Sequence, residues 1–172
     1  QTGNNHVLND AVRGAGWWLF SDDSGAEQNL TTYFTGFDSD GFSAALGGGG
    51  LNAAYNYVAW NWKASNATAV SNTAGTITSQ VSANPTAGFS IVSYTGTGAN
   101  ATVGHGLDAA PDVLITKARQ NGVSYWLTYH AGLGNNTHYM ALNTTGAVDT
   151  GGASVWNSTS PTSSVFSVGT SS

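Results

Sequence analysis

Acidic residues at two turns are the first candidates for chemistry in this chain. Asp22 and Asp23 precede Ser24-Gly25, and Asp38 and Asp40 lie in an Asp-Ser-Asp-Gly run. Such a run offers the first and third ligands and the glycine of a calcium loop, but not the other ligands. Asp and Gly also form ordinary turns. If the two turns meet, Asp22, Asp23, Asp38 and Asp40 could hold Ca²⁺; otherwise we expect no cofactor.

Three histidines lie in contexts that could hold a ligand. His105 stands between two glycines, where its ring either faces a ligand or bonds a neighbouring backbone carbonyl, and we prefer the second interpretation. His130 and His138 flank a loop, but a metal site needs a third ligand, and no carboxylate lies nearby in the sequence. We therefore expect structural roles for these side chains.

The carboxylates and hydroxyls form no pattern that is typical of catalysis. Glycoside hydrolysis needs two facing carboxylates, and the second half offers only Asp108, Asp112 and Asp149, all in turn-like contexts. No serine occupies a Gly-x-Ser-x-Gly elbow, and no nucleophile pairs with a base. The sequence therefore predicts no catalytic residues and a protein that is not an enzyme.

The chain has six tryptophans and seven tyrosines, whose ring faces suit the C–H groups of sugars. Trp60 and Trp62 share one face of a predicted strand with Val58, so we expect both rings to be buried. The candidate ligand-binding residues are Trp17, Trp126 and Trp156.

Apolar residues that alternate with polar ones predict an all-β chain. Residues 89–94 and 112–119 show a period of two, which is typical of half-buried strands. Turn residues 95–100 should reverse the chain after the first of these runs, so that residues 101–103 run back beside it. Residues 55–63 are apolar on both faces, which predicts a central strand. We expect an antiparallel β-sandwich of the jelly-roll or concanavalin-like type. The residues expected in its core are Val58, Trp60, Phe89, Ile91, Val113, Ile115, Leu127 and Phe166.

A weak internal repeat suggests two related units. Trp17-Trp18-Leu19 and Tyr139-Met140-Ala141-Leu142 each precede a Gly-Ala pair and then an aromatic-Ser run. We expect a first β unit at residues 1–70, incomplete at its N-terminus. A linker or edge strand at 71–87 leads to a second unit at 88–172, incomplete at its C-terminus. Because an unpaired edge recruits another strand, either the chain is one piece of a longer polypeptide or a neighbouring subunit fills the gap.

Charge is scarce in this sequence. Charged residues make up 8% of the chain and hydrophobic residues 40%, with a net charge of −5. This balance favours a folded chain that meets little like-charge repulsion on assembly. The few cations cannot neutralise a phosphate backbone, which argues against nucleic-acid binding, and no apolar run is long enough for membrane insertion. The absence of cysteine excludes disulfides and thiolate metal sites.

Several sequence motifs together point to a known family. The motifs are GFSIVSYTGTG at 88–98, GHGL at 104–107, LITK at 114–117 and PTSSVFSVG at 161–169. They resemble those of a repeated β-domain found in virion structural proteins of marine tailed bacteriophages. Together with YVAW at 57–60, they spread the similarity over most of the chain. The resemblance implies a concanavalin-like sandwich, in a tail-fibre-like or appendage protein without catalytic residues. In that family a Tyr-Val-Ala-aromatic strand follows the Ser-Val-Gly-Thr-Ser-Ser segment, a strand that this sequence does not contain after Ser172.

These observations lead us to expect a non-enzymatic virion structural protein of a tailed bacteriophage. It would be an outward-facing fibre, appendage or decoration subunit on the virion surface, with a role in host attachment. Its expected partners are copies of itself, other virion proteins and a host surface glycan. The alternatives are a carbohydrate-binding module and a secreted adhesin or filament subunit.

Overall fold

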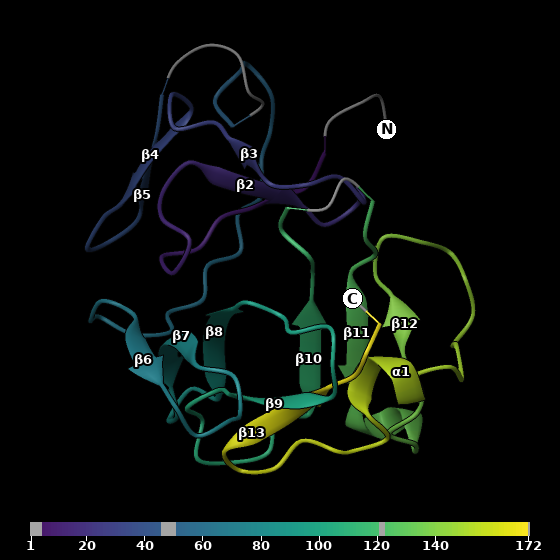
Figure 1. Cartoon of the computed structure of the whole chain (residues 1–172). Helices are drawn as coiled ribbons and strands as arrows, with labels where there is room; N and C mark the ends of the chain where they lie inside the picture. Colours follow the sequence, from purple (N-terminus) through teal and green to yellow (C-terminus); the bar gives the residue numbers. More distant parts are fainter. Residues whose placement is uncertain (1–4, 46–50, 121–122, 172) are drawn as a thin grey trace.

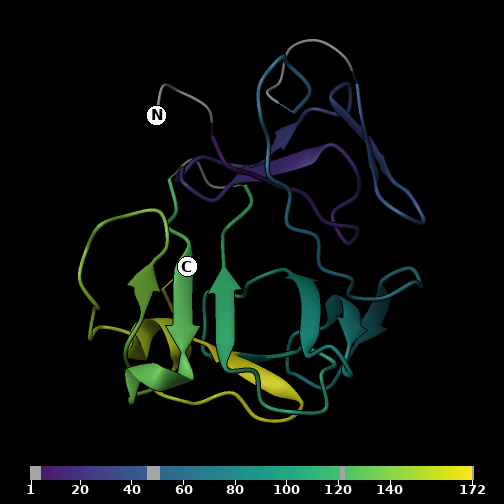
Figure 2. The ribbon, with the colours of Figure 1, turned by 180° about the vertical axis from the view of Figure 1, so that it is seen from behind.

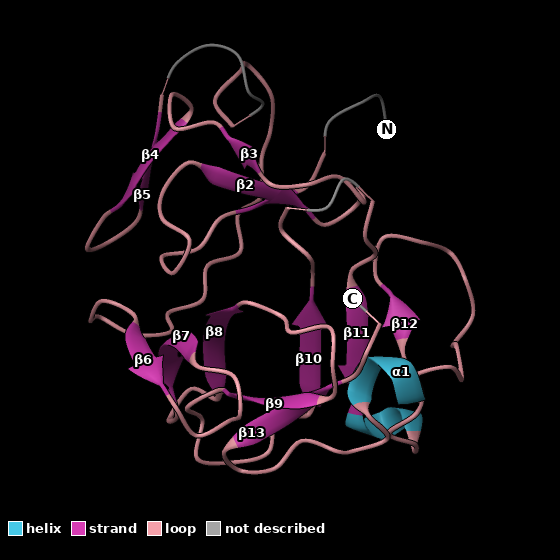
Figure 3. Ribbon diagram, viewed as in Figure 1, coloured by secondary structure: helices cyan, strands magenta, loops and turns pink. Residues whose placement is uncertain are grey.

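The computed structural model describes residues 5–45, 51–120 and 123–171, which are mostly β and form several small antiparallel sheets (Figures 1 and 3). Five strands lie together at the top of Figure 1 and come from the first 45 residues. Three of them form the sheet β1-β2-β3, and β4 pairs with β5. Their bounds are β1 Val7–Leu8, β2 Trp17–Phe20, β3 Gln28–Asn29, β4 Phe34–Phe37 and β5 Phe42–Ala44.

The larger part of the fold follows residue 69. Two three-stranded sheets, β6-β7-β8 and β10-β11-β12, stand side by side, and the β9-β13 pair crosses them (Figures 1 and 2). The bounds are β6 Val70–Asn72, β7 Ser79–Asn84, β8 Phe89–Tyr94, β9 Ala101–Gly104, β10 Val113–Thr116, β11 Leu127–His130, β12 Met140–Ala141 and β13 Val165–Val168, with a 3-10 helix η1 at Ala131–Leu133 and a helix α1 at Ala153–Trp156.

The main core lies where β9 and β13 cross the side-by-side sheets. Val103, Ile77 and Phe166 are buried there, so the prediction for Phe166 is confirmed. Val92 and Tyr94 of β8 and Leu114 of β10 pack against them, and a second cluster joins Tyr129 of β11 to Val155 and Trp156 of α1. Removing these apolar side chains from water is the main favourable term for this half of the fold.

Polar contacts attach the β1–β5 region to the segment between β10 and β11. The Trp126 indole N–H lies 2.8 Å from the Phe20 carbonyl oxygen and 3.1 Å from that of Asp23. The Arg119 guanidinium donates to both carboxylate oxygens of Glu27 at 3.0 Å. The Lys117 ammonium donates to the Ser24 carbonyl at 3.1 Å. The junction is therefore held by hydrogen bonds and charge pairs.

Residues 55–63 are not the central strand that the sequence predicted. They form no regular element (Figure 3), and the exposed fractions are 82% for Val58 and 76% for Trp60, so the prediction that these two side chains are buried is wrong. A strand with two apolar faces is stable only when neighbouring strands pair with it and layers cover it. No described strand pairs with this segment.

Several further expectations differ from the structure, mainly because of how the strands are paired. Val113 and Ile115 are 46% and 51% exposed, since they lie on the uncovered face of the edge strand β10. Phe89, Ile91 and Leu127 are only half-buried. Residues 95–100 do not close a hairpin, because β9 pairs with β13 instead of β8. The predicted linker or edge strand at 71–87 contains β7, which pairs on both sides.

The division into units at 1–70 and 88–172 remains a prediction. The sequence also predicts a flexible loop at the glycines 47–50 and a hairpin turn at the Asn-Gly pair 121–122, and both lie outside the described residues. Among the described helices, none has the length and apolar character needed to cross a membrane.

Candidate functional site

The structure places two of the three candidate sugar-binding tryptophans in the interior. The exposed fraction of Trp126 is 6% and that of Trp156 is 2%. Trp126 uses its indole N–H to hold the β1–β5 region, and Trp156 packs edge-on against Tyr129 with ring centres 6.2 Å apart. Trp17 lies half-buried in β2. A sugar cannot stack on the rings of Trp126 and Trp156, because their faces are already covered.

The four candidate calcium ligands serve as local hydrogen-bond acceptors or stay exposed. An Asp22 carboxylate oxygen accepts from the His6 backbone N–H at 2.7 Å, and one of Asp23 accepts from that of Gly25 at 3.2 Å. The Asp38 carboxylate accepts from the Ser43 hydroxyl at 2.7 Å, and Asp40 is exposed. Within residues 5–45, 51–120 and 123–171, no three His, Asp or Glu side chains gather as a metal site. The two acidic turns are therefore not brought together as a calcium site.

The ring nitrogens of His105 and His130 bond backbone groups. His105 is 2% exposed; its Nε2 lies 3.1 Å from the Thr162 carbonyl oxygen, and its Nδ1 accepts from the Leu107 N–H at 3.2 Å. Both ring nitrogens are thus satisfied in the neutral tautomer that carries its hydrogen on Nε2. The interpretation of His105 as a corner residue that bonds a backbone carbonyl is confirmed. His130 similarly accepts from the Gly132 N–H at 2.9 Å.

Burial of His105 makes the fold sensitive to acid. Burial lowers the pKa of its imidazole below the usual value of 6.5, although the Thr162 carbonyl and Asp108 oppose this shift. The unfolded chain then binds a proton more readily than the folded chain between these two pKa values. We expect the contribution of His105 to the free energy of unfolding to be constant above about pH 6.5, to fall as the pH drops from there to the lowered pKa, and to level off below it.

Urea unfolding of the wild type and of His105→Gln between pH 7.5 and 4.5 checks this expectation. The variant should be less stable at pH 7.5 but should lose less stability on acidification. His130→Gln, at an exposed position, serves as the control and should retain the slope of the wild type. An identical slope in His105→Gln would contradict the assignment.

The most conspicuous exposed surface is a segment that we call the aromatic strip, defined by Tyr55, Tyr57, Val58, Trp60 and Trp62. Their exposed fractions range from 49% for Tyr57 to 82% for Val58. Soluble proteins rarely expose so many large apolar side chains together, and such patches mark interaction sites. The strip is the strongest candidate for a functional surface in the described chain.

Aromatic contacts and one hydrogen bond fix the C-terminal end of the strip. The Trp62 ring stacks on Phe89 with ring centres 6.1 Å apart, and Trp60 meets Trp62 edge-on at 6.2 Å. The Asn84 amide donates to the Lys63 carbonyl at 3.2 Å, and Ala64 is buried. The strip is therefore anchored beside the β7–β8 turn while its side chains stay accessible.

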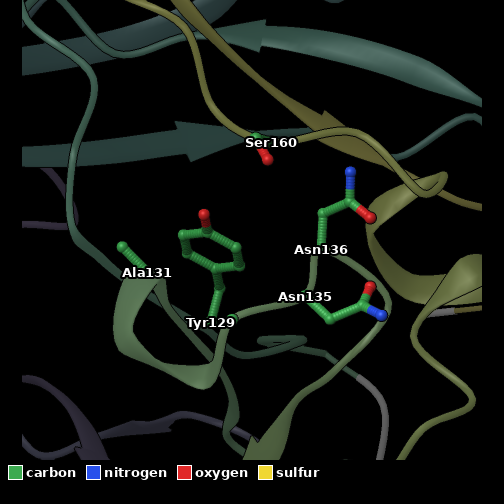
Figure 4. Close-up of a pocket in the computed structure, with 6 residues that line it drawn as sticks. Tyr129, Ala131, Asn135, Asn136 and Ser160 are labelled. Atoms are coloured by element: carbon green, nitrogen blue, oxygen red, sulfur yellow. The ribbon is translucent and has the colours of Figure 1, made fainter.

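A second candidate is a shallow polar hollow between η1 and the loop after α1. Tyr129, Asn135, Asn136 and Ser160 lie around a volume of about 350 Å³ (Figure 4). No charged side chain lines it, so it offers amide and hydroxyl groups but no acid or base. The hollow is therefore better suited to binding a small neutral molecule than to catalysing a reaction.

Sequence reasoning found the aromatic residues of the strip but assigned them to the core. Residues 55–63 have the sequence pattern of a covered central strand, but no strand among the described residues pairs with them, so their side chains stay exposed. The sequence signal that points to exposure is the flanking composition, because glycine-rich residues precede the segment and Ser, Asn and Thr follow it.

Comparison with known proteins gives a family but no activity. A family model described as a domain of unknown function (DUF7483) matches residues 1–172. No curated protein and no solved structure matches the chain. The function therefore has to be argued from the chain's own residues.

Proposed function

Because the chain belongs to the DUF7483 family, whose description names no activity, we propose a function from the strip and from the motifs of the sequence. The protein is a non-enzymatic structural component of a tailed-bacteriophage virion, an outward-facing fibre, appendage or decoration subunit. The aromatic strip is the observation that carries this proposal, because it presents five large side chains for contact on one short segment. The resemblance of 88–98 and 161–169 to virion proteins supports the location.

The proposal includes a sandwich of the jelly-roll or concanavalin-like type. The sheets β6-β7-β8 and β10-β11-β12 would form one layer, and β9 with β13 would belong to the other. Burial of Val103 and Phe166, with Val92 and Leu114 packed against them, supports this arrangement. A rigid sandwich suits an appendage, because it holds its contact surface at a fixed position.

The chemistry of the strip favours assembly or attachment. Lys63 is the only charged residue between Asp40 and Asp108, so little charge surrounds the exposed rings. Burying these rings against a partner is favourable, at about 25 cal/mol per Å² of apolar surface, and little charge has to be desolvated. The proposed partners are further copies, other virion proteins and a host surface glycan.

Location on the particle tests the proposed role. We expect mass spectrometry of phage particles purified on a density gradient to detect this chain in several copies per particle. Gold-labelled antibody against the strip should label the particle exterior in electron micrographs. Recovery of the chain only from the culture supernatant or the bacterial surface would contradict the virion role and favour a secreted adhesin or filament subunit.

Binding of a host glycan is the second candidate function. Exposed Trp60 and Trp62 rings offer apolar faces on which sugar C–H groups can stack, and Asn56 and Asn61 lie beside them in the sequence. A glycan array probed with the wild type and with Trp60→Ala tests this function. Tyr125→Ala, at another exposed aromatic position, is the matched control. Binding that survives Trp60→Ala would exclude the strip as the sugar site.

A further inference from the structure

The strands β8 and β10 face each other with unpaired edges. β8 pairs with β7 and β10 with β11, and no pairing joins β8 to β10. The two strands nevertheless stand side by side (Figures 1 and 2). The Arg119 guanidinium, just after β10, donates to the hydroxyl of Ser93 near the end of β8 at 3.0 Å. The C-terminal ends of the two strands therefore lie at the same end of the layer.

Two neighbouring strands that run in the same direction leave a specific vacancy in an antiparallel layer. One strand placed between them and running the opposite way would pair with both. Unpaired strand edges are templates for such addition. Every residue of β8 is only half-buried, and Val113 and Ile115 of β10 are exposed, so an added strand would also extend an apolar face.

The aromatic strip has the properties that this position requires. Between Asn56 and Trp62 no backbone hydrogen bond to another described residue is present. Tyr55 and Tyr57 alternate with Asn56, Val58, Trp60 and Trp62, which gives apolar side chains on both faces, as for a strand in the middle of a covered sheet. The strip offers a free strand, and the layer offers two free edges.

We propose that the aromatic strip of one copy enters the layer of a second copy, between β8 and β10, as an antiparallel strand. Insertion into the same copy is disfavoured by the anchor of the strip. Asn84, at the end of β7, holds Lys63, and Ala64 is buried, whereas the vacancy lies on the opposite edge of β8. Insertion in the same copy breaks these contacts, while insertion into a neighbour preserves them.

Strand donation of this kind is head-to-tail. The strip of each copy fills the layer of the next, so the contact generates a ring if the rotation closes and a filament if it does not. This inference rests on the proposed role of the strip as a contact surface. It adds the partner, a second copy, and the mode of contact, which is backbone pairing with the side chains buried on both faces.

Sedimentation of the 172-residue chain over a range of concentrations tests the proposal. The wild type should associate, and Val58→Pro, which removes a backbone N–H from the inserted strand, should weaken the association at least tenfold. The same change should leave the thermal midpoint of the monomer unchanged, because that N–H has no described partner. Ala147→Pro, in an exposed loop without strand structure, is the matched control and should associate like the wild type.

Single cysteines identify the site, because the chain contains no cysteine of its own. Val58→Cys or Ala59→Cys is mixed with Ile115→Cys under mild oxidation, because these two positions would lie on opposite faces of the inserted strand. A disulfide-linked heterodimer is expected for one of the two pairs, and none with Val148→Cys as the acceptor. A variant that carries both cysteines of the reactive pair in one chain tests insertion into the same copy. A disulfide that forms only within this chain, and not between chains, would overturn the proposal.

Two other results would overturn it. One is a wild-type chain that stays monomeric at every concentration, and the other is association that Val58→Pro leaves intact. A monomer whose strip binds glycans identifies the strip as a sugar site instead. A monomeric chain found on virions refutes only this inference, whereas strand exchange in a chain absent from virions refutes only the proposed location.

Discussion

Replacing Glu27 with Gln is expected to lower the free energy of unfolding by about 3–5 kcal/mol, the usual cost of removing one partner from a buried charge pair. The Glu27 side chain is 7% exposed, and its carboxylate lies 2.8 Å from the Arg119 guanidinium and 3.7 Å from that of Arg13. Arg13 is 6% exposed and also pairs with Asp10. The amide of Gln would leave both guanidinium groups without their shared counter-charge.

Urea denaturation at neutral pH measures this effect. Asp40→Asn, which removes a carboxylate from an exposed turn, is the control and should change stability by less than about 0.5 kcal/mol. In a double-mutant cycle, Arg119→Gln should cost much less in the Glu27→Gln background than in the wild type. Equal costs in the two backgrounds would show that this ion pair does not hold the junction.

The charge network explains why the β1–β5 region stays attached to the rest of the fold. Three of the four cations of the chain, Arg13, Lys117 and Arg119, lie at this junction, together with its only glutamate. The sequence shows that charged residues are few, but it does not show that these four come together, because Glu27 and Arg119 are 92 positions apart. In a chain with so few charges, the gathering of four at one place, with the Glu27 and Arg13 side chains buried, indicates that the junction requires a specific geometry.

The sequence predicted several strands well, because alternation reports which residues share a face. β8 at Phe89–Tyr94 coincides with the predicted run, and β10 at Val113–Thr116 lies within the predicted run at 112–119. Alternation does not report which strands pair. The residues at 95–100 connect β8 to β9, which belongs to a different sheet, instead of closing a hairpin. Gly98, at φ 71°, allows the chain to bend there.

The candidate site was harder to predict for the same reason. Burial of Trp126 depends on carbonyl acceptors at Phe20 and Asp23 that are more than 100 residues away. Trp60 is exposed because no strand among the described residues pairs with its segment and covers it. Ring chemistry can be read from a sequence, whereas accessibility is decided by long-range pairing.

Truncation of Trp156 and of Trp60 should have very different effects on the free energy of unfolding. Trp156→Ala should cost about 3–5 kcal/mol, because it empties a large buried volume beside Tyr129 and Val155. Trp60→Ala should change the stability of the monomer by less than about 0.5 kcal/mol, since its ring is 76% exposed. The sequence pattern predicted instead that the Trp60 ring is buried, where its truncation would carry a cost of about 3–5 kcal/mol.

Urea unfolding monitored by far-ultraviolet circular dichroism, at a protein concentration low enough to prevent association, checks both values. Trp156→Phe serves as the conservative control. It keeps an aromatic ring and removes an indole N–H that is buried without a partner among the described residues, so its cost should be well below that of Trp156→Ala. A large loss of monomer stability in Trp60→Ala would instead place that ring in the core, and it would remove the basis for treating the aromatic strip as a contact surface.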